Sequence, residues 1–143
     1  MLLWKCSVLG NFLRAERGAV AIQMGILLTV LIGMVALGTE VPFVLYKHRQ
    51  LQSAADAAAF GSAVALSRGY PSNPTVEGQG IAAALGFGNN VNGITVTINN
   101  PPATGAHAGN ATAVETIVAQ PQTLTLVGLF ISNPFRLSAR AVA

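Results

Sequence analysis

The sequence predicts an α+β fold in which a long N-terminal helix crosses a membrane and continues into a small antiparallel β-sheet domain. The first observation is a run of 22 residues without a charge, 18–39. The second is a seam of small residues at helical spacing in the stretch that follows, 44–67. The third is a set of short segments near the C-terminus in which apolar and polar residues alternate, as in strands with one buried face.

The uncharged run, bounded by Arg17 and Glu40, has the length of a membrane-spanning helix. At about 1.5 Å per residue it would extend roughly 33 Å, and the hydrocarbon core of a bilayer is about 30 Å thick. The alternative is a buried helix of a soluble core, but such helices seldom run so long without a polar face. Residues 18–39 are therefore predicted to form a single transmembrane helix.

Small residues recur every four positions within this run, at Gly25, Thr29 and Gly33. In lipid, a face of small residues lets two helices approach closely and associate. The alternative is a lone anchor that contains ordinary membrane glycines. We interpret the three residues as a membrane-helix packing face.

A proline follows closely on the end of the run. The ring of Pro42 would press on the carbonyl of Gly38 and leave it without its helical partner, and glycine tolerates that distortion. We expect a kink in a continuing helix rather than a stop. Glu40 is expected at the level of the lipid headgroups.

Residues 40–69 are predicted to continue the helix as a seam of small side chains that ends at Gly69. The spacings along the seam are 4, 3, 4 and 3 residues, which is a heptad pattern. Such a seam permits very close packing by a partner helix, or lets a sheet lie directly on the helix. Its members are Leu51, Ala55, Ala58, Ser62 and Ala65.

Residues 70–143 are predicted to form a separate α+β domain that begins with a short helix. Asn73 can cap this helix and Pro74 suits its first position, so we expect it to run from Pro74 to about Leu85. Ile81, Leu85 and the neighbouring alanines are expected to point inward. The asparagine-rich residues 89–93 are typical of a turn.

Three strands are predicted after this turn. They are Ile94–Asn99, the clearest, then Ala113–Ala119, which Gln120–Gln122 interrupts with a proline, and finally Phe135–Ala143. Residues 124–131 are apolar on all sides, and periodicity does not decide between helix and strand. The last strand should direct its apolar face toward the core and expose its other face to solvent. The apolar face consists of Phe135, Leu137, Ala139, Ala141 and Ala143.

The charge distribution indicates a membrane and excludes nucleic acid as a partner. The net charge is +3, but from Tyr70 onward the charges sum to zero. Five basic residues flank the apolar run, where anionic headgroups attract them, and no basic patch interleaved with aromatic residues exists elsewhere. The N-terminal side has one more Lys or Arg than the C-terminal side, which favours a cytoplasmic leader, residues 1–17. The five are Lys5, Arg14, Arg17, Lys47 and Arg49.

No catalytic or metal-binding pattern is present in the sequence. His48 and His107 are isolated from cysteines and carboxylates at ligand spacing, and Cys6 is the only cysteine. Neither a nucleophile elbow nor a phosphate-binding glycine loop occurs. We therefore expect a non-enzyme with no cofactor and no small-molecule substrate.

Three motifs together resemble the TadE/TadG-like family of the Flp (Tad) pilus-assembly system, and the first two resemble its TadG-like N-terminal domain. They are RGAVA at 17–21, LQSAADAAA at 51–59 and the ending SARAVA at 138–143. The resemblance implies a pilin-like fold, a single pass through the bacterial inner membrane and a periplasmic C-terminal domain. It also implies a membrane-anchored structural or assembly role in a pilus or secretion apparatus. The partners would be other pilus-assembly or pilin-like proteins, including copies of this chain, associated laterally through the packing face and the seam.

The family also raises the question of N-terminal processing. Prepilin-like members are cut after a glycine and carry glutamate as the fifth residue of the mature chain. Here a cut between Gly18 and Ala19 would place Gln23 at that position. The rival is ordinary signal cleavage after Gly38, with Ala36 as the other small residue, which would release residues 39–143 as a secreted structural module.

Overall fold

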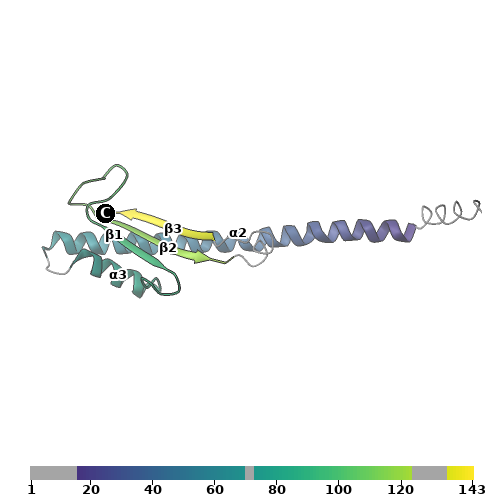
Figure 1. Cartoon of the computed structure of the whole chain (residues 1–143), viewed down its shortest axis with the longest axis horizontal. Coiled ribbons are helices and arrows are strands. Elements are labelled where there is room, and N and C mark those ends of the chain that lie inside the picture. The colour runs from purple at the N-terminus through teal and green to yellow at the C-terminus, as the bar shows by residue number, and fades with distance from the viewer. Residues whose placement is uncertain (1–15, 70–72, 124–134) are drawn as a thin grey trace, which may run out of the picture. The chain divides into compact units, whose positions relative to one another are not determined.

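The computed structural model describes residues 16–69, 73–123 and 135–143. Within these ranges an apolar helix is followed by a short helix and a three-stranded antiparallel sheet, which confirms the α+β prediction (Figure 1). The chain divides into two compact units between Thr39 and Glu40. The elements are α2 (Glu16–Ser67), α3 (Pro74–Ala84), β1 (Thr95–Asn99), β2 (Glu115–Gln122) and β3 (Phe135–Val142).

Helix α2 is continuous through Gly38 and Pro42. In the first unit its hydroxyl groups are satisfied within the helix: Thr29 Oγ1 donates to the carbonyl of Gly25 at 3.0 Å, and Thr39 Oγ1 donates to that of Val35 at 2.9 Å. These bonds satisfy both threonine hydroxyl donors inside the helix, which matters because the hydrocarbon of a bilayer offers them no partner. The expected absence of a helix stop at Pro42 is confirmed, and the kink stays a prediction.

Helix α3 begins as its sequence predicts. Asn73 Oδ1 accepts a hydrogen bond from the Thr75 amide at 3.1 Å, and Pro74 occupies the first turn. The inward orientation predicted for Leu85 is wrong, because Leu85 is the C-cap residue and 50% exposed. The helical period ends there, and Phe87, beyond the cap, enters the core instead.

The turn between α3 and β1 uses left-handed backbone at three asparagine or glycine positions of the predicted cluster. The φ angles of Asn90, Asn92 and Gly93 are 62°, 51° and 74°. Asparagine and glycine are the residues that adopt this conformation at least cost. The turn predicted for residues 89–93 is confirmed.

The sheet has the order β1-β2-β3, and both pairs of strands are antiparallel. Strand β2 begins two residues later than predicted and runs through Pro121 to Gln122, so the predicted interruption is wrong. Val114 and Ala143 exchange two backbone hydrogen bonds, at 2.7 and 3.0 Å.

Because hydrogen-bonded and non-hydrogen-bonded pairs alternate along an antiparallel ladder, the Pro121–Arg136 pair is non-hydrogen-bonded. The backbone nitrogen of Pro121, which carries no hydrogen, therefore faces away from β3. On that side β1 has already ended, since its last pair is Thr95–Ala119. The proline thus occupies a local edge, where no donor is required.

Strand β3 shows the predicted alternation. Leu137 and Ala139 are buried, whereas Arg136, Ser138 and Arg140 are exposed. The two ends of the predicted apolar face, Phe135 and Ala143, are exposed, because they lie at the ends of the sheet beyond the core. The question of helix or strand at 124–131 lies outside the described residues.

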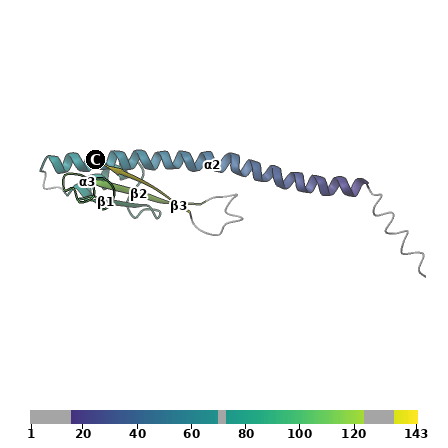
Figure 2. The same cartoon turned by 90° about the horizontal axis from the view of Figure 1, so that it is seen from above.

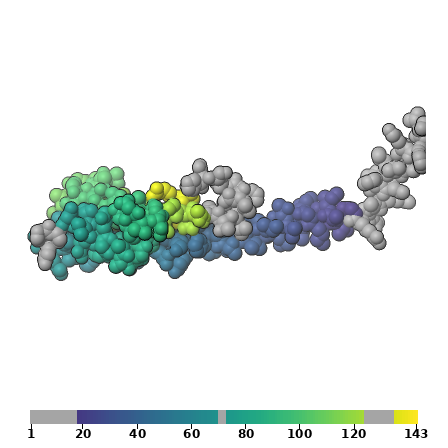
Figure 3. Space-filling view, turned by 60° about the horizontal axis from the view of Figure 1, so that its bottom comes forward, coloured from purple at the N-terminus to yellow at the C-terminus, as the bar shows by residue number. Residues whose placement is uncertain are grey.

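In the second unit, the sheet and α3 pack along the same stretch of α2, as two perpendicular views show (Figures 1 and 2). The space-filling view shows the atoms of α3 and the strands gathered over this part of the helix (Figure 3). The helix-facing side of the sheet carries Ile98, Val96, Val118, Ala139 and Leu137. The core on the α2 side consists of Leu51, Ala54, Ala55 and Ala58.

Candidate assembly surfaces

The predicted membrane-packing face is open in the structure. A Cβ atom built on Gly25 or Gly33 would meet no other atom within 4 Å. Thr29, between them, is exposed and turns its hydroxyl onto the backbone of Gly25. Large apolar side chains surround this face, including Ile22 at 68% and Ile26 at 64% exposure. In lipid, such a narrow face would allow the backbone of a second helix to come close.

The residues considered for N-terminal processing all lie in the first turns of α2. The helix begins at Glu16, so the peptide bond between Gly18 and Ala19 is helical. The side chains of Ala19 and Gln23 are exposed. Cleavage by a prepilin-type peptidase stays a prediction.

The five seam residues are buried within the chain, and Leu51, Ala55 and Ala58 belong to the core that α2 shares with α3 and the sheet. Leu51, Ala55, Ala58 and Ser62 are 0% exposed, and Ala65 is 9% exposed. Of the two occupants that the sequence left open, the structure therefore has the sheet, together with α3, and not a partner helix. The prediction that the seam also serves lateral association does not fit this arrangement, because a folded chain leaves no seam surface for a partner.

The crossing of α2 and α3 depends on two glycines that the sequence reasoning missed. A Cβ on Gly61 would lie 2.0 Å from Ile81 Cδ1, and a Cβ on Gly78 would lie 2.2 Å from Ser62 Oγ and 3.2 Å from the backbone oxygen of Ala58. Ser62 Oγ also donates to the carbonyl of Pro74 at 2.9 Å. One feature of the sequence does indicate these positions. Both glycines lie inside predicted helices, where glycine is less favourable than alanine by about 1 kcal/mol.

A second cluster missed from the sequence surrounds the buried carboxylate of Glu115 on β2. The amides of Ala103 and Asn99 donate to Glu115 Oε2 at 3.0 and 2.9 Å, and Arg140 on β3 forms an ion pair with Oε1. These interactions lower the pKa of Glu115 to about 2, with the Ala103 N–H as the largest cause, then Asn99, while burial opposes them and Arg140 adds to them. Arg140 also donates to the carbonyl of Thr104, so the cluster fastens the loop after β1 to the sheet.

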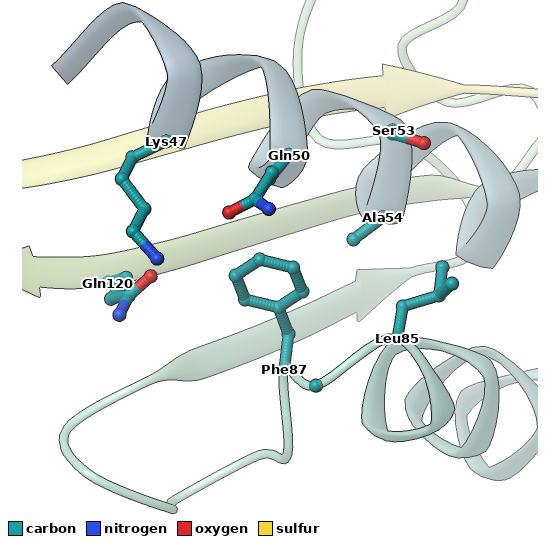
Figure 4. A pocket seen from close by; sticks show the side chains of 8 residues that line it. Lys47, Gln50, Ser53, Ala54, Leu85, Phe87 and Gln120 are labelled. Carbon is teal, nitrogen blue, oxygen red and sulfur yellow. The ribbon is translucent and has the colours of Figure 1, made fainter. Parts of the chain in front are cut away.

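A cleft of about 420 Å³ lies between α2, the segment after α3 and β2 (Figure 4). Its polar lining comes from Lys47, Gln50 and Ser53 on α2 and from Gln120 on β2, whereas Phe87 and its neighbours supply apolar surface. Figure 4 shows the side chains of Lys47 and Gln120 extending from their two elements toward the same space. No signal in the sequence predicts this cleft, because the interruption predicted at Gln120–Gln122 ends the strand before Gln120.

In the part of the chain that the structure describes, no group of three or more His, Cys, Asp or Glu side chains is placed to hold a metal ion. His48 and His107 are both exposed, on α2 and on the loop after β1 respectively. Over the same residues, α2 is the one helix long and apolar enough to cross a membrane.

Comparison with known families gives a match to residues 18–65, which correspond to the predicted span and seam helix. The matching model is that of the Tad family, described as Flp pilus-assembly TadE/G-like. The resemblance stated from RGAVA and LQSAADAAA is thereby confirmed over this range. Neither curated proteins nor solved structures gave a match, and the pilin-like character of the fold stays a prediction.

Proposed function

From the premise that residues 18–65 are TadE/G-like, we propose that the chain is a membrane-anchored structural component of a Flp/Tad-type pilus or secretion apparatus. The observation that carries the proposal is the match itself, because one continuous match includes both the uncharged run and the seam. The proposed topology is a single pass through the bacterial inner membrane. The greater number of basic residues before the span supports a cytoplasmic N-terminus and a periplasmic C-terminal domain.

The proposed mechanism is lateral association of spanning helices through Gly25, Thr29 and Gly33. The open surface at both glycines supports it, whereas the seam is occupied by the chain's own core. The partners would be other pilus-assembly or pilin-like proteins, including further copies of this chain. The role proposed is structural rather than catalytic, without a cofactor or a small-molecule substrate.

The test is to replace the packing face with large side chains. Gly25→Leu combined with Gly33→Leu should reduce chemical crosslinking of the full chain in membranes, and the number of pili, by about fivefold or more, because leucine keeps the backbones apart. Met34→Leu is the control: it also introduces a leucine, at an exposed position nine residues from Gly25 and therefore about 180° around the helix from that glycine. Unchanged crosslinking in the double variant would contradict the mechanism.

A further inference from the structure

The cleft between α2 and β2 combines one cation with uncharged polar groups and an apolar wall. Lys47 contributes an ammonium group, Gln50, Ser53 and Gln120 contribute neutral donors and acceptors, and Phe87 contributes a ring face. We propose that this cleft binds the headgroup of an anionic phospholipid, a phosphodiester that carries hydroxyl groups. The proposal rests on the proposed function, because it requires the span to be in a membrane.

The phosphate would be held by Lys47. This side chain is half-buried, unlike its exposed neighbours His48 and Arg49. No ion pair of Lys47 is found among the described residues, and its ammonium lies 5.8 Å from the centroid of the Phe43 ring. A partly desolvated ammonium without a carboxylate is stabilised by an anion that enters from outside.

The hydroxyl groups of the headgroup would form hydrogen bonds with Gln120. Its Oε1 atom is buried and has no hydrogen-bond donor among the described residues. A buried acceptor without a donor is unfavourable, so a ligand hydroxyl that donates to it once the Gln120 side chain turns into the cleft would remove this cost. Ser53 lines the same cleft and supplies a further donor for phosphate oxygens, as does the second N–H of the Gln50 amide, whose Nε2 also donates to Tyr46 Oη at 2.9 Å.

The position along α2 fits a headgroup rather than a soluble ligand. Lys47 comes eight residues after Thr39, the last residue of the uncharged run, which is about 12 Å of helix. The interfacial layer outside the hydrocarbon is roughly 5–8 Å thick. The ammonium of Lys47 lies beside the ring of Phe43, whose position four residues after Thr39 is about 6 Å along the helix and therefore within that layer. The apolar wall of Phe87 and Leu85 would contact the carbon atoms of the headgroup.

The test uses the full chain in mild detergent, with bound lipid counted by native mass spectrometry. Phosphatidylglycerol should be retained over phosphatidylcholine of the same acyl chains by at least fivefold. Lys47→Ala should remove most of this preference, and so should Gln120→Glu, which keeps the side-chain volume and adds a repelling charge. Arg49→Ala, which removes the same charge from an exposed position outside the cleft, should keep the preference within about twofold. Thermal unfolding of each variant establishes that the fold is intact.

Three results would overturn the assignment. If Lys47→Ala and Arg49→Ala reduced the preference for phosphatidylglycerol equally, the cause would be a general attraction between the basic residues beside the span and the lipid. Equal retention of the two lipids would mean no headgroup recognition. Binding of glycerol phosphate, which has no acyl chains, at the same concentrations would assign the cleft to a soluble ester. Since the measurement is made in detergent, its failure is separable from a failure of membrane anchoring.

Discussion

Glu115 is the residue on which the loop after β1 most depends. Its carboxylate is fully buried, yet both oxygens have partners, which come from β1, β3 and the loop itself. Removing either the carboxylate or its charged partner from such a buried arrangement strongly destabilises a protein, because the remaining group is left buried without its partner. The cluster is therefore a structural fastening of the second unit.

Glu115→Gln should lower the free energy of unfolding of the second unit by about 2 kcal/mol, because the charge-assisted bonds to Arg140 and the Ala103 amide are lost. Urea unfolding of the full chain, followed by circular dichroism, measures the change. Glu77→Gln, on the exposed side of α3, is the control and should cost less than about 0.5 kcal/mol. Equal effects of the two substitutions would contradict the role given to Glu115.

Acid should destabilise the second unit through the same residue. The pKa of Glu115 is lowered from 4.5 to about 2, so its stabilisation is fully present above pH 4.5 and is lost as the pH falls through this window. The loss amounts to about 3 kcal/mol. Unfolding curves of the wild type between pH 5 and 2 should show it, and those of Glu115→Gln should be flatter. Parallel pH profiles for the two proteins would rule out Glu115 as the acid-sensitive group.

At the scale of elements, the packing of α3 on α2 requires the absence of a side chain at Gly78. Gly78→Ala places a methyl group against Ser62 and the Ala58 carbonyl, and overpacking of this kind costs about 1–3 kcal/mol. Gly80→Ala, in the same helix with open space around it, should instead stabilise by about 0.5–1 kcal/mol, because alanine favours the helix. Thermal melts that shift in the same direction for both variants would contradict this account of the crossing.

The seam gives a second test at this scale. Ala58→Leu should destabilise the second unit by more than about 2 kcal/mol, because the residue is fully buried against the chain's own core. Ala57→Leu, at the half-buried neighbouring position, should change stability by less than half as much. Hydrogen exchange of the strand amides reports the loss of packing. A seam that instead served a partner would leave exchange unchanged in the isolated chain.

The limits of sequence reasoning at this scale have physical causes. Both helices, the asparagine-rich turn and the three strands followed from local chemistry: the apolar run, the Asn73 cap and the alternation in β3. The continuation of β2 through Pro121 did not follow, because it depends on where β1 ends. The partners of Glu115 likewise depend on strand register, which brings Asn99 and Arg140 beside it.

For the whole molecule, the domain boundaries expected from the sequence stay a prediction, and the structure gives a division into compact units. The two compact units divide between Thr39 and Glu40, where the uncharged run ends. The occupant of the seam was left open, because small residues at heptad spacing suit a helix and a sheet equally. Only the three-dimensional packing distinguishes the two.

The central claim is that residues 19–39 remain on the mature chain and anchor it in the membrane. The most direct measurement is the intact mass of the protein recovered in the membrane pellet after an alkaline carbonate wash. The account predicts a membrane-retained chain that includes this span, whether it begins at Met1 or, after processing, at Ala19. A soluble chain that begins at Thr39 would contradict it and would identify a secreted module instead.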